Sequence, residues 1–454
     1  MLADLHKLTI AEASSEIAEG KLSSVSLVEC FLRRIDQLEP SLKAWVTIDK
    51  AAVTETAAQL DRELNTKGPR SPLHGIPVGI KDIYYTAGMK TTACSKVYAD
   101  FVPTYDATSV ARLKEAGAIV LGKTVTTEFA AGDPPPTVNP WNSAHTPGGS
   151  SSGSAVAVAV RMCPGAMGSQ TGGSIIRPSS YNGIVGLKPT FGRISCYGVI
   201  PVAWSLDTIG PLVNCIEDAA IMLQALAGYD PKDPGSSEEP VPDYRRALDQ
   251  IDTPPRIGLI KDFFFVRSDP EVQKHTEEAA QLLAKGGAQV EEVSLPPSFA
   301  TAADVQWTIN NVECAAYHEE SFRSRADDYS NRLRERIEVG LLTPATHYIQ
   351  AQRLRRVYRR EMDALARQWD VLLTPTTPTP APRDLSTTGD PVFQSPWTSC
   401  GLPTVTVPSG LSPSTGLPLG VQLAASSFAE ARLLAVARWC ERTLNVHLTP
   451  PQVS

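Results

Sequence analysis

Residues 168–178 read GSQTGGSIIRP, and this stretch decides how the rest of the chain is interpreted. Gly172 and Gly173 directly precede Ser174. Glycine permits backbone conformations in which several N–H groups aim at one point, which is how an oxyanion hole is built. A flexible linker would not continue into apolar Ile175 and Ile176. The stretch therefore predicts a shaped backbone around the Ser174 hydroxyl.

A second glycine- and serine-rich stretch, TPGGSSSGSAVAVAV, covers residues 146–160. Such a composition is typical of a flexible linker. Here it runs into uninterrupted Ala and Val over 155–160, which require burial. The turn at Ser150, Ser151 and Ser152 is therefore expected to be held against the core, where serine hydroxyls can relay a proton.

A third stretch, GIPVGIKD, covers residues 75–82 and places Lys81 at the end of an apolar strand. Desolvation disfavours the charged form of a lysine and lowers its pKa, so that it can act as a base near neutral pH. The alternative interpretation is a surface lysine paired with Asp82.

Together the three stretches resemble the amidase signature family of serine hydrolases, which use a Ser-cis-Ser-Lys triad. The family's serine-rich element precedes its nucleophile by 24 residues, and Ser150 and Ser174 are 24 apart. YNGIVGLKPTFGRIS (181–195) and SLDTIGPL (205–212) are similar to the family's continuation. The resemblance implies an α/β fold with a large, mixed, twisted sheet covered by helices on both faces.

The resemblance also implies roles for individual residues. Ser174 would be the nucleophile, Lys81 the base, and Ser150, preceded by a cis peptide bond, the bridge between them. Ser151 would support this network by hydrogen bonding. The backbone N–H groups expected to form the oxyanion hole belong to Thr171, Gly172, Gly173 and Ser174.

Three positions depart from the commonest family pattern. Ser152 stands where glycine is usual, and Gln170 stands where aspartate is frequent. Ile176 and Arg177 replace Arg-Ile or Arg-Gln. In some members an arginine at this place binds a substrate carboxylate, so Arg177 is interpreted either as a structural salt bridge or as a substrate contact. Gln170 and Arg177 are the candidate determinants of specificity.

The first 65 residues predict a layer of three helices. Thr9 with Glu12 and Ser26 with Glu29 match the capping-box pattern, in which a hydroxyl and a carboxylate three residues later satisfy free N–H groups. Pro40 is expected to close the second helix.

Beyond residue 65, apolar strands alternate with amphipathic helices, which predicts a parallel or mixed sheet covered by helices. Strands are predicted at 76–80, 118–122, 257–260, 288–295, 370–375, 403–408 and 419–425. Helices are predicted at 51–64, 109–117, 269–285, 302–323, 344–368 and 428–444.

The predicted organisation is a helical layer (1–65), a catalytic core (66–228), a surface linker (229–256) and a C-terminal α/β part that completes the sheet and pocket (257–454), within one large domain. Pocket walls are expected near Trp141, Trp204, Trp397 and 303–345.

The formal net charge of −7 argues against a nucleic-acid surface, which requires clustered Lys and Arg. One basic run lies within residues 353–360. Leu354, Val357, Met362 and Leu365 recur there at helical spacing, so the arginines are interpreted as a solvated helix face. A polyanion or partner site is the alternative.

Composition and motifs indicate neither a metal nor a cofactor. The eight cysteines include no C-x-x-C pair. GAIVLGKT (117–124) matches the P-loop pattern, but a helix precedes it and apolar strand formers fill its centre, so a nucleotide site is excluded. The N-terminus lacks the features of a signal peptide, and no apolar stretch is long enough for a membrane helix. We expect a cytoplasmic monomer or homodimer with a small-molecule substrate.

The predicted activity is cofactor-independent hydrolysis of C–N bonds other than peptide bonds through an acyl-Ser174 intermediate. Small or aryl amides are the expected substrates, carbamates (urethanes) and ureas are possible ones, and esters are expected side substrates. One alternative is the glutaminase component of a tRNA-dependent amidotransferase. The other is a non-catalytic binding module on the same fold.

Overall fold

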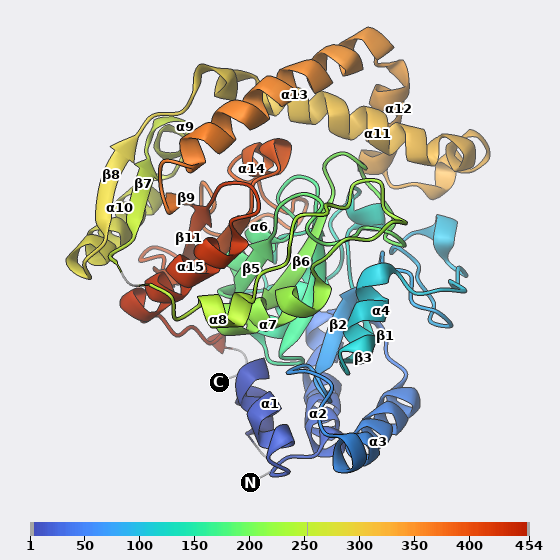
Figure 1. Cartoon of the computed structure of the whole chain (residues 1–454). Coiled ribbons are helices and arrows are strands. Elements are labelled where there is room, and N and C mark those ends of the chain that lie inside the picture. The colour runs from blue at the N-terminus through green and yellow to red at the C-terminus, as the bar shows by residue number, and fades with distance from the viewer. Residues whose placement is uncertain (1–3, 252, 452–454) are drawn as a thin grey trace.

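The computed structural model describes residues 4–251 and 253–451, and the strands of this part form one mixed, 11-stranded sheet (Figure 1). Their order across the sheet is β1-β3-β2-β4-β6-β5-β10-β11-β9-β7-β8. Strands β2, β3 and β4 run parallel, as do β7, β8 and β9, and the remaining pairs are antiparallel. The strands are β1 (Trp45–Thr47), β2 (Pro77–Lys81), β3 (Ile119–Thr124), β4 (Gly165–Gln170), β5 (Val185–Lys188), β6 (Thr208–Val213), β7 (Arg256–Ile260), β8 (Gln289–Val293), β9 (Val371–Pro375), β10 (Thr404–Leu411) and β11 (Pro418–Ala424).

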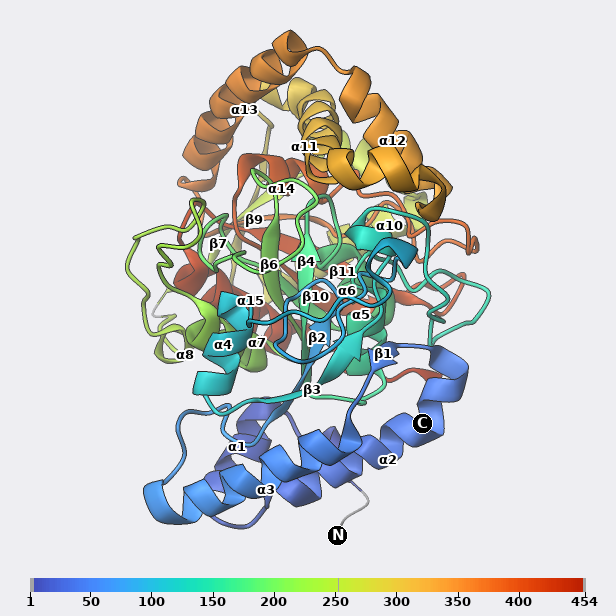
Figure 2. The ribbon, with the colours of Figure 1, turned by 90° about the vertical axis from the view of Figure 1, so that its right-hand side faces the viewer.

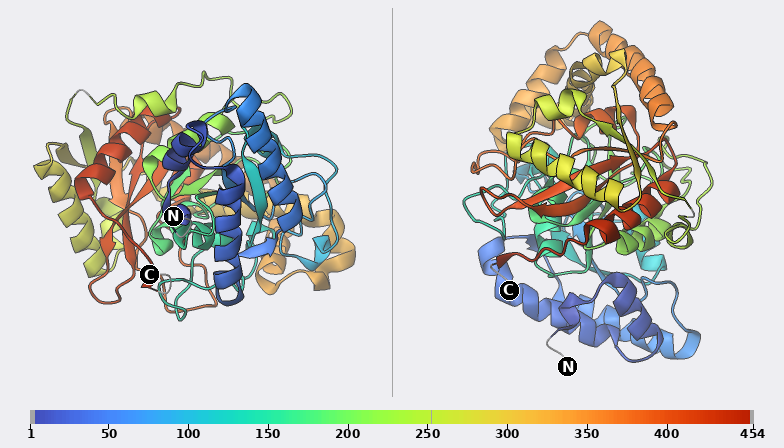
Figure 3. Two further views of the ribbon diagram at one scale, coloured as in Figure 1. Left: turned by 90° about the horizontal axis from the view of Figure 1, so that it is seen from below. Right: turned by 90° about the vertical axis from the view of Figure 1, so that its left-hand side faces the viewer.

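Helices cover both faces of this sheet, as Figure 2 and Figure 3 show, and the predicted fold class is confirmed. One layer consists of α4 (Thr108–Glu115), α7 (Ile216–Leu226), α10 (Pro270–Lys285) and α15 (Glu430–Leu444). The opposite layer contains α5 (Ser152–Ala159) and α6 (Ile176–Asn182), which pack on the central strands and on each other. Every residue of α5 is buried, as its Ala and Val content predicts.

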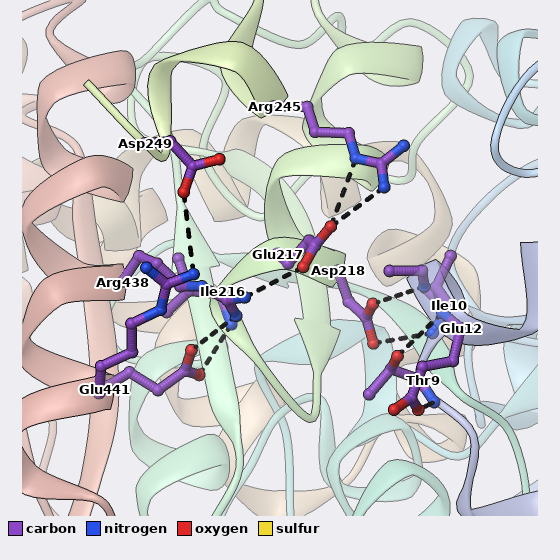
Figure 4. Close-up of polar contacts among 12 residues, drawn as sticks. Thr9, Ile10, Glu12, Ile216, Glu217, Asp218, Arg245, Asp249, Arg438 and Glu441 are labelled. Carbon is purple, nitrogen blue, oxygen red and sulfur yellow. Dashed lines mark hydrogen bonds and ion pairs between the residues drawn. The ribbon is translucent and has the colours of Figure 1, made fainter. Parts of the chain in front are cut away.

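The N-terminal layer consists of α1 (Ile10–Ala18), α2 (Ser24–Leu42) and α3 (Lys50–Lys67), drawn in blue below the sheet in Figures 1 and 2. The predicted capping box at Thr9 is confirmed. Asp218 of α7 accepts a hydrogen bond from the backbone N–H of Ile10 (3.0 Å), as Figure 4 shows, and another from the N–H of Ala11 (3.1 Å). A carboxylate from the core thus satisfies free N–H groups at the start of α1 and anchors the layer.

The predicted boundaries of the second helix are wrong at both ends. Ser23 caps α2, because its side chain accepts a hydrogen bond from the N–H of Ser26, which lies in the first turn. Pro40 lies inside the helix, which continues to Leu42 and ends where Lys43 adopts a left-handed conformation (φ 53°). Ser26 is therefore not the cap, and its backbone N–H is one of the free donors that the cap residue satisfies.

Three helices form an arch over one end of the sheet: α11 (Ala302–Arg325), α12 (Asn331–Leu342) and α13 (Ala345–Ala366), at the top of Figure 1. Helix α14 (Ser395–Cys400) packs beneath α11 and α13. The sequence did not predict α12, whose buried residues are only Leu333, Ile337 and Gly340. Two shorter helices, α8 (Tyr244–Ala247) and α9 (Asp262–Val266), complete the arrangement.

The predicted solvated face of α13 is confirmed for Arg353, Arg356, Arg359 and Arg360, which are exposed. The prediction is wrong at Arg355 and at two of the apolar positions. Leu354 and Val357 are 47% and 39% exposed, whereas Arg355 and Tyr358 are buried. The reason is that the Arg355 guanidinium donates to the carbonyl oxygens of Ser399 (2.7 Å) and Ser205 (2.6 Å). An arginine stem can pack in the core when its donors find acceptors.

The predicted linker is held at its start by side-chain contacts. Asp230 accepts hydrogen bonds from the hydroxyls of Thr108 and Ser195, both 2.6 Å. Strands from both sides of the linker share the sheet, since β5 pairs with β10. The division at 1–65, 66–228, 229–256 and 257–454 stays a prediction, and residues 1–3, 252 and 452–454 lie outside the described residues. A search of the described helices finds none with the length and apolar character of a membrane span.

Candidate active site

Lys81 ends β2, between β3 and β4, and its side chain is fully buried. Its Nζ donates to the hydroxyls of Ser150 (2.7 Å), Ser151 (3.1 Å) and Ser169 (2.9 Å). The interpretation of Lys81 as a surface lysine paired with Asp82 is wrong, because Asp82 accepts instead from Thr92. Ser169 was not predicted as a partner, since only the parallel pairing of β2 with β4 brings it beside Lys81.

Burial lowers the pKa of Lys81 to about 7, and the nearby carboxylate of Asp207 offsets part of this effect. A lysine in water has a pKa near 10.4, so it is almost entirely charged at neutral pH. In this site a large fraction of Lys81 is neutral at pH 7 and can accept a proton.

Ser150 follows a cis peptide bond to Gly149, as the family resemblance implied. It lies just before α5, and the backbone N–H of Ser151 donates to the carbonyl oxygen of Ser174 (3.3 Å). Ser150 and Ser174 line the same cavity, whose volume is about 500 Å³. The structure therefore brings Lys81, Ser150, Ser151 and Ser174 together at one place.

The peptide groups before Ser174 are held in fixed orientations by their carbonyl oxygens. The carbonyl of Thr171 accepts from the Gln306 side chain (2.9 Å), and that of Gly172 accepts from the Thr398 hydroxyl (2.9 Å). The Gly173 carbonyl accepts from the N–H of Arg177 (2.9 Å). In a planar trans peptide the next N–H points opposite to the carbonyl. The N–H groups of residues 172–174 are thus fixed as a set.

The reason for glycine in this turn differs from the predicted one. Neither Gly172 nor Gly173 has a positive φ. A Cβ on residue 173 would lie 2.6 Å from Oε1 of Gln394 and 3.2 Å from Nη1 of Arg177. Glycine is therefore required at 173 for close packing.

Gln170 stabilises the turn from the buried side, away from the cavity. It is fully buried, and its Oε1 accepts from the N–H groups of Ile175 and Ile176, both 3.0 Å. Its Nε2 donates to Thr398 (3.1 Å). These contacts occupy the side chain, which is not among the residues that line the cavity, so Gln170 holds the start of α6.

Arg177 is buried at the wall of the cavity. Its Nη2 donates to the Gly149 carbonyl (2.7 Å) and the Thr388 hydroxyl (3.0 Å). Within residues 4–251 and 253–451, its Nε and Nη1 have no hydrogen-bond partner, and no carboxylate lies within ion-pair distance. The structural salt bridge that was one interpretation of Arg177 is therefore not found in the described part.

The walls of the cavity come from several regions outside the three motifs, among them Thr127, residues 130–132 and Val202. Helices α11 and α12 contribute Gln306, Trp307, Asn310, Arg332, Glu335, Arg336 and Val339, all within the predicted segment 303–345. Residues 387–389, Pro391 and Ser395, which the sequence did not single out, close another side. The three predicted tryptophans do not line this cavity. Trp397 is buried in the core, and Trp204 borders a separate cavity of about 380 Å³.

The described residues contain no group of three or more His, Cys, Asp or Glu side chains arranged to hold a metal ion. The candidate site contains a buried lysine, serine hydroxyls and ordered backbone N–H groups.

A family model described as Amidase matches residues 26–434. The chain belongs to the amidase family. Amidase-family enzymes are hydrolases that act on C–N bonds, and this is the chemistry that the family assigns to the chain.

Relatives of this amidase-family chain match it over almost its whole length. It is 38% identical to a glutamyl-tRNA(Gln) amidotransferase subunit from Roseiflexus castenholzii, covering 100% of this chain and 99% of the relative. The solved peptide amidase from Stenotrophomonas maltophilia has a TM-score of 0.86 and 32% identity, covering 99% of both chains. A chain from a vestigial protein complex linked to the origins of an s-triazine catabolic enzyme has a TM-score of 0.90 and 32% identity, covering 97% of this chain and 99% of that one.

Proposed function

We propose that this chain hydrolyses an amide C–N bond through a covalent ester on Ser174. The observation that carries the proposal is the buried Lys81, bonded to serine hydroxyls at the cavity that Ser174 also lines. Neutral Lys81 accepts a proton through Ser150 while the Ser174 oxygen attacks the substrate carbonyl carbon. The charge that develops on the carbonyl oxygen is stabilised by the N–H groups of residues 171–174.

The same groups complete the cycle. Lys81 returns the proton through Ser150 to the leaving nitrogen as the C–N bond breaks, so that ammonia or an amine departs and an ester remains on Ser174. Water then attacks this ester, giving its proton to the relay. The carboxylic acid is released, and Ser174 recovers its hydroxyl proton. No cofactor takes part in this proposed sequence.

We propose further that the substrate amide carries a carboxylate. Arg177 lines the cavity, and two of its buried nitrogen atoms, Nε and Nη1, have no hydrogen-bond partner in the described chain. Arg336 of α12 also lines the cavity, with no carboxylate within ion-pair distance in the described chain, whereas Arg332 pairs with Asp133 (3.6 Å). Unpaired guanidinium groups favour a carboxylate, which they can bind with two parallel hydrogen bonds.

Glutamine combines a primary amide with a carboxylate, and its ammonium group would find Glu335 at the same wall. The proposed substrate thus agrees with the name of the amidotransferase relative. We therefore propose glutamine amide hydrolysis as the function that these observations favour, with the ammonia passing to a partner protein.

A second candidate is hydrolysis of small or aryl amides or carbamates by the chain alone. Trp307, 56% exposed, and Val339 give the cavity an apolar rim that suits an aryl group. The Stenotrophomonas relative is a peptide amidase, which agrees with a stand-alone activity.

The test begins with a fluorophosphonate probe on the purified chain and on Ser174→Ala. We expect labelling of the unaltered chain only, and equal labelling of both would exclude Ser174 as the nucleophile. A non-catalytic binding module would label in neither form.

Substrate class is then decided by turnover of glutamine, an aryl amide, an aryl carbamate and an aryl ester. Arg336→Gln should raise KM for glutamine by about 10-fold or more, since a hydrogen bond between charged groups contributes about 1.5–3 kcal/mol. The same variant should leave KM for a neutral aryl amide unchanged. Turnover of the aryl substrates without ammonia release from glutamine would favour the second candidate.

A further inference from the structure

Helix α13 carries a separate, arginine-lined cavity, which shares no lining residue with the cavity at Ser174. Its volume is about 430 Å³. The residues that line it are Gln352, Arg355, Arg356, Arg359, Arg360, Asp363, Cys400 and Ser427. We call this set the α13 arginine cavity. The volume lies within the range of small-molecule sites.

The arginines of this cavity form no close ion pair in the described chain, although the charge of Glu313 acts on Arg355 from a greater distance. Among the described residues, no carboxylate lies within 4.0 Å of the four arginine side chains. Asp363, the one acidic residue of the set, pairs with Arg367 (2.7 Å) and accepts from the N–H of Ser427 (2.8 Å). The carboxylate at this wall is therefore already engaged elsewhere.

The arginines also stand at spacings where like charges repel. Arg355 and Arg359, and likewise Arg356 and Arg360, are four residues apart on the same helix, an arrangement that destabilises helices. Burial and the nearby charge of Arg359 lower the pKa of Arg355 to about 10. The Arg359 guanidinium also lies beside Gly401, where an added Cβ would be 3.6 Å from Nη2. A bound anion would remove this repulsion.

We propose that the α13 arginine cavity binds a phosphoryl group, supplied by a small phosphate ester or by inorganic phosphate. Several guanidinium groups around one open cavity provide the paired, planar donors that phosphate oxygens accept. Arg355 is already oriented by its bonds to Ser399 and Ser205, so little side-chain entropy is lost when its remaining donors bind.

The same arginine connects the cavity to the turn before Ser174. Ser399, which accepts from Arg355, follows Thr398, and the Thr398 hydroxyl donates to the Gly172 carbonyl (2.9 Å). A ligand that binds the remaining donors of Arg355 would hold this side chain in its bonds to Ser399 and Ser205, and so would restrain α14 and, through it, Gly172. The bound phosphoryl group is therefore expected to change the mobility of this turn.

Binding is tested by calorimetry at low ionic strength with inorganic phosphate and with glycerol 3-phosphate. The variants are Arg356→Gln and Arg359→Gln. The matched control is Arg353→Gln, which removes an exposed arginine of the same helix that does not line the cavity. We expect each cavity variant to weaken binding by about 10-fold or more, and the control to leave it unchanged.

Tighter binding of glycerol 3-phosphate identifies an ester as the ligand, and tighter binding of inorganic phosphate identifies the free ion. Equal weakening by Arg353→Gln, or binding of neither probe, would overturn the proposal. Binding of an oligonucleotide in place of both probes would overturn it as well.

The connection between the α13 arginine cavity and the turn before Ser174 is tested by hydrogen exchange of the backbone amides at 171–174. Exchange is measured with and without the phosphate compound that binds more tightly. We expect slower exchange with the probe bound, and no change in Arg359→Gln. Unchanged exchange in the saturated protein would refute the connection. Neither readout depends on amide hydrolysis, so a failure here is separate from a failure of the proposed function.

Discussion

Two buried lysines on neighbouring parallel strands provide an internal comparison. Lys81 ends β2, and Lys123 lies on β3, paired across from Ile80. Both side chains are fully buried. Burial lowers the pKa of each to about 7, and carboxylates nearby offset part of this shift in both.

The two ammonium groups differ in their acceptors. Lys81 donates to three serine hydroxyls, one of which, that of Ser150, lies at the cavity wall. Lys123 donates to the Thr91 hydroxyl (2.8 Å) and to the Tyr84 carbonyl oxygen, away from the cavity. A hydroxyl at the cavity wall can accept one proton and pass on another to a reacting group, whereas the Thr91 hydroxyl does not line the cavity and a carbonyl oxygen only accepts. A lowered lysine pKa is thus a general result of burial, and the neighbouring hydroxyls give Lys81 its proposed role.

The largest difference between Lys81 and Lys123 is expected in kcat when the amine of each side chain is removed. Lys81→Met should lower kcat by about 100-fold or more, the usual size of a general-base contribution. The measurement is steady-state hydrolysis of the best substrate at pH 7.5, as a standard assay condition, with folding checked by circular dichroism. Near-normal turnover would contradict the role proposed for Lys81.

The pH dependence of the unaltered chain sharpens the comparison. Only neutral Lys81 accepts a proton, so kcat/KM should fall by about 10-fold for each pH unit below its pKa of about 7. Above that pH the rate should level off. The decrease in kcat/KM at low pH should persist in Lys123→Met. If this variant loses the decrease, the group that titrates is Lys123 and not Lys81.

A smaller effect is expected when one of the three hydroxyls is removed. Ser169→Ala should lower kcat by roughly 10-fold, since one hydrogen bond to a charged group is lost. The lost acceptor had stabilised charged Lys81, so the decrease in kcat/KM at low pH should move to lower pH. A lower rate with an unmoved pH profile would mean that Ser169 acts only on the packing of β4.

The smallest effect on rate is expected for Lys123→Met, within about threefold, because a volume-conserving apolar residue replaces a group outside the cavity. Its effect should appear in stability. Between pH 7 and about 10, Lys123 is neutral in the folded chain and charged in the unfolded chain, so unfolding takes up a proton and stability rises with pH.

Lys123→Met should remove about 1.4 kcal/mol per pH unit from that rise. Urea unfolding of both forms at several pH values in this range measures the difference. Parallel stability curves for the variant and the unaltered chain would show that Lys123 is charged in the folded state.

Local sequence was sufficient where one short segment carries the whole feature. The turn before Ser174, the buried α5 and the strand that ends at Lys81 each depend on residues adjacent in the chain, and glycine, apolar runs and hydroxyls identified them. Most strands could be located in the same way, because burial on both faces leaves a continuous apolar run.

Local sequence failed where a polar side chain is buried by a distant partner. The α13 periodicity placed Leu354 inside and Arg355 outside, because apolar spacing does not reveal that the carbonyls of Ser205 and Ser399 would accept from a buried guanidinium. Ser23 in place of Ser26 as the α2 cap is a smaller error of the same kind, since both hydroxyls satisfy the pattern and only the backbone geometry selects one.

The sequence by itself determined the family, seven of the described strands and the set Lys81, Ser150 and Ser174, because these depend on short-range patterns that the fold requires. It did not predict β4, β5 and β6, which lie at the centre of the sheet. Tertiary structure decided that Ser169 joins Lys81, that Gln170 stabilises the turn from the buried side, and that Arg336 of α12 faces the cavity. The physical reason is that a buried polar group must find its partner wherever the packed chain brings one. That partner lay on the next strand for Lys81 and on a helix more than a hundred residues away for the turn.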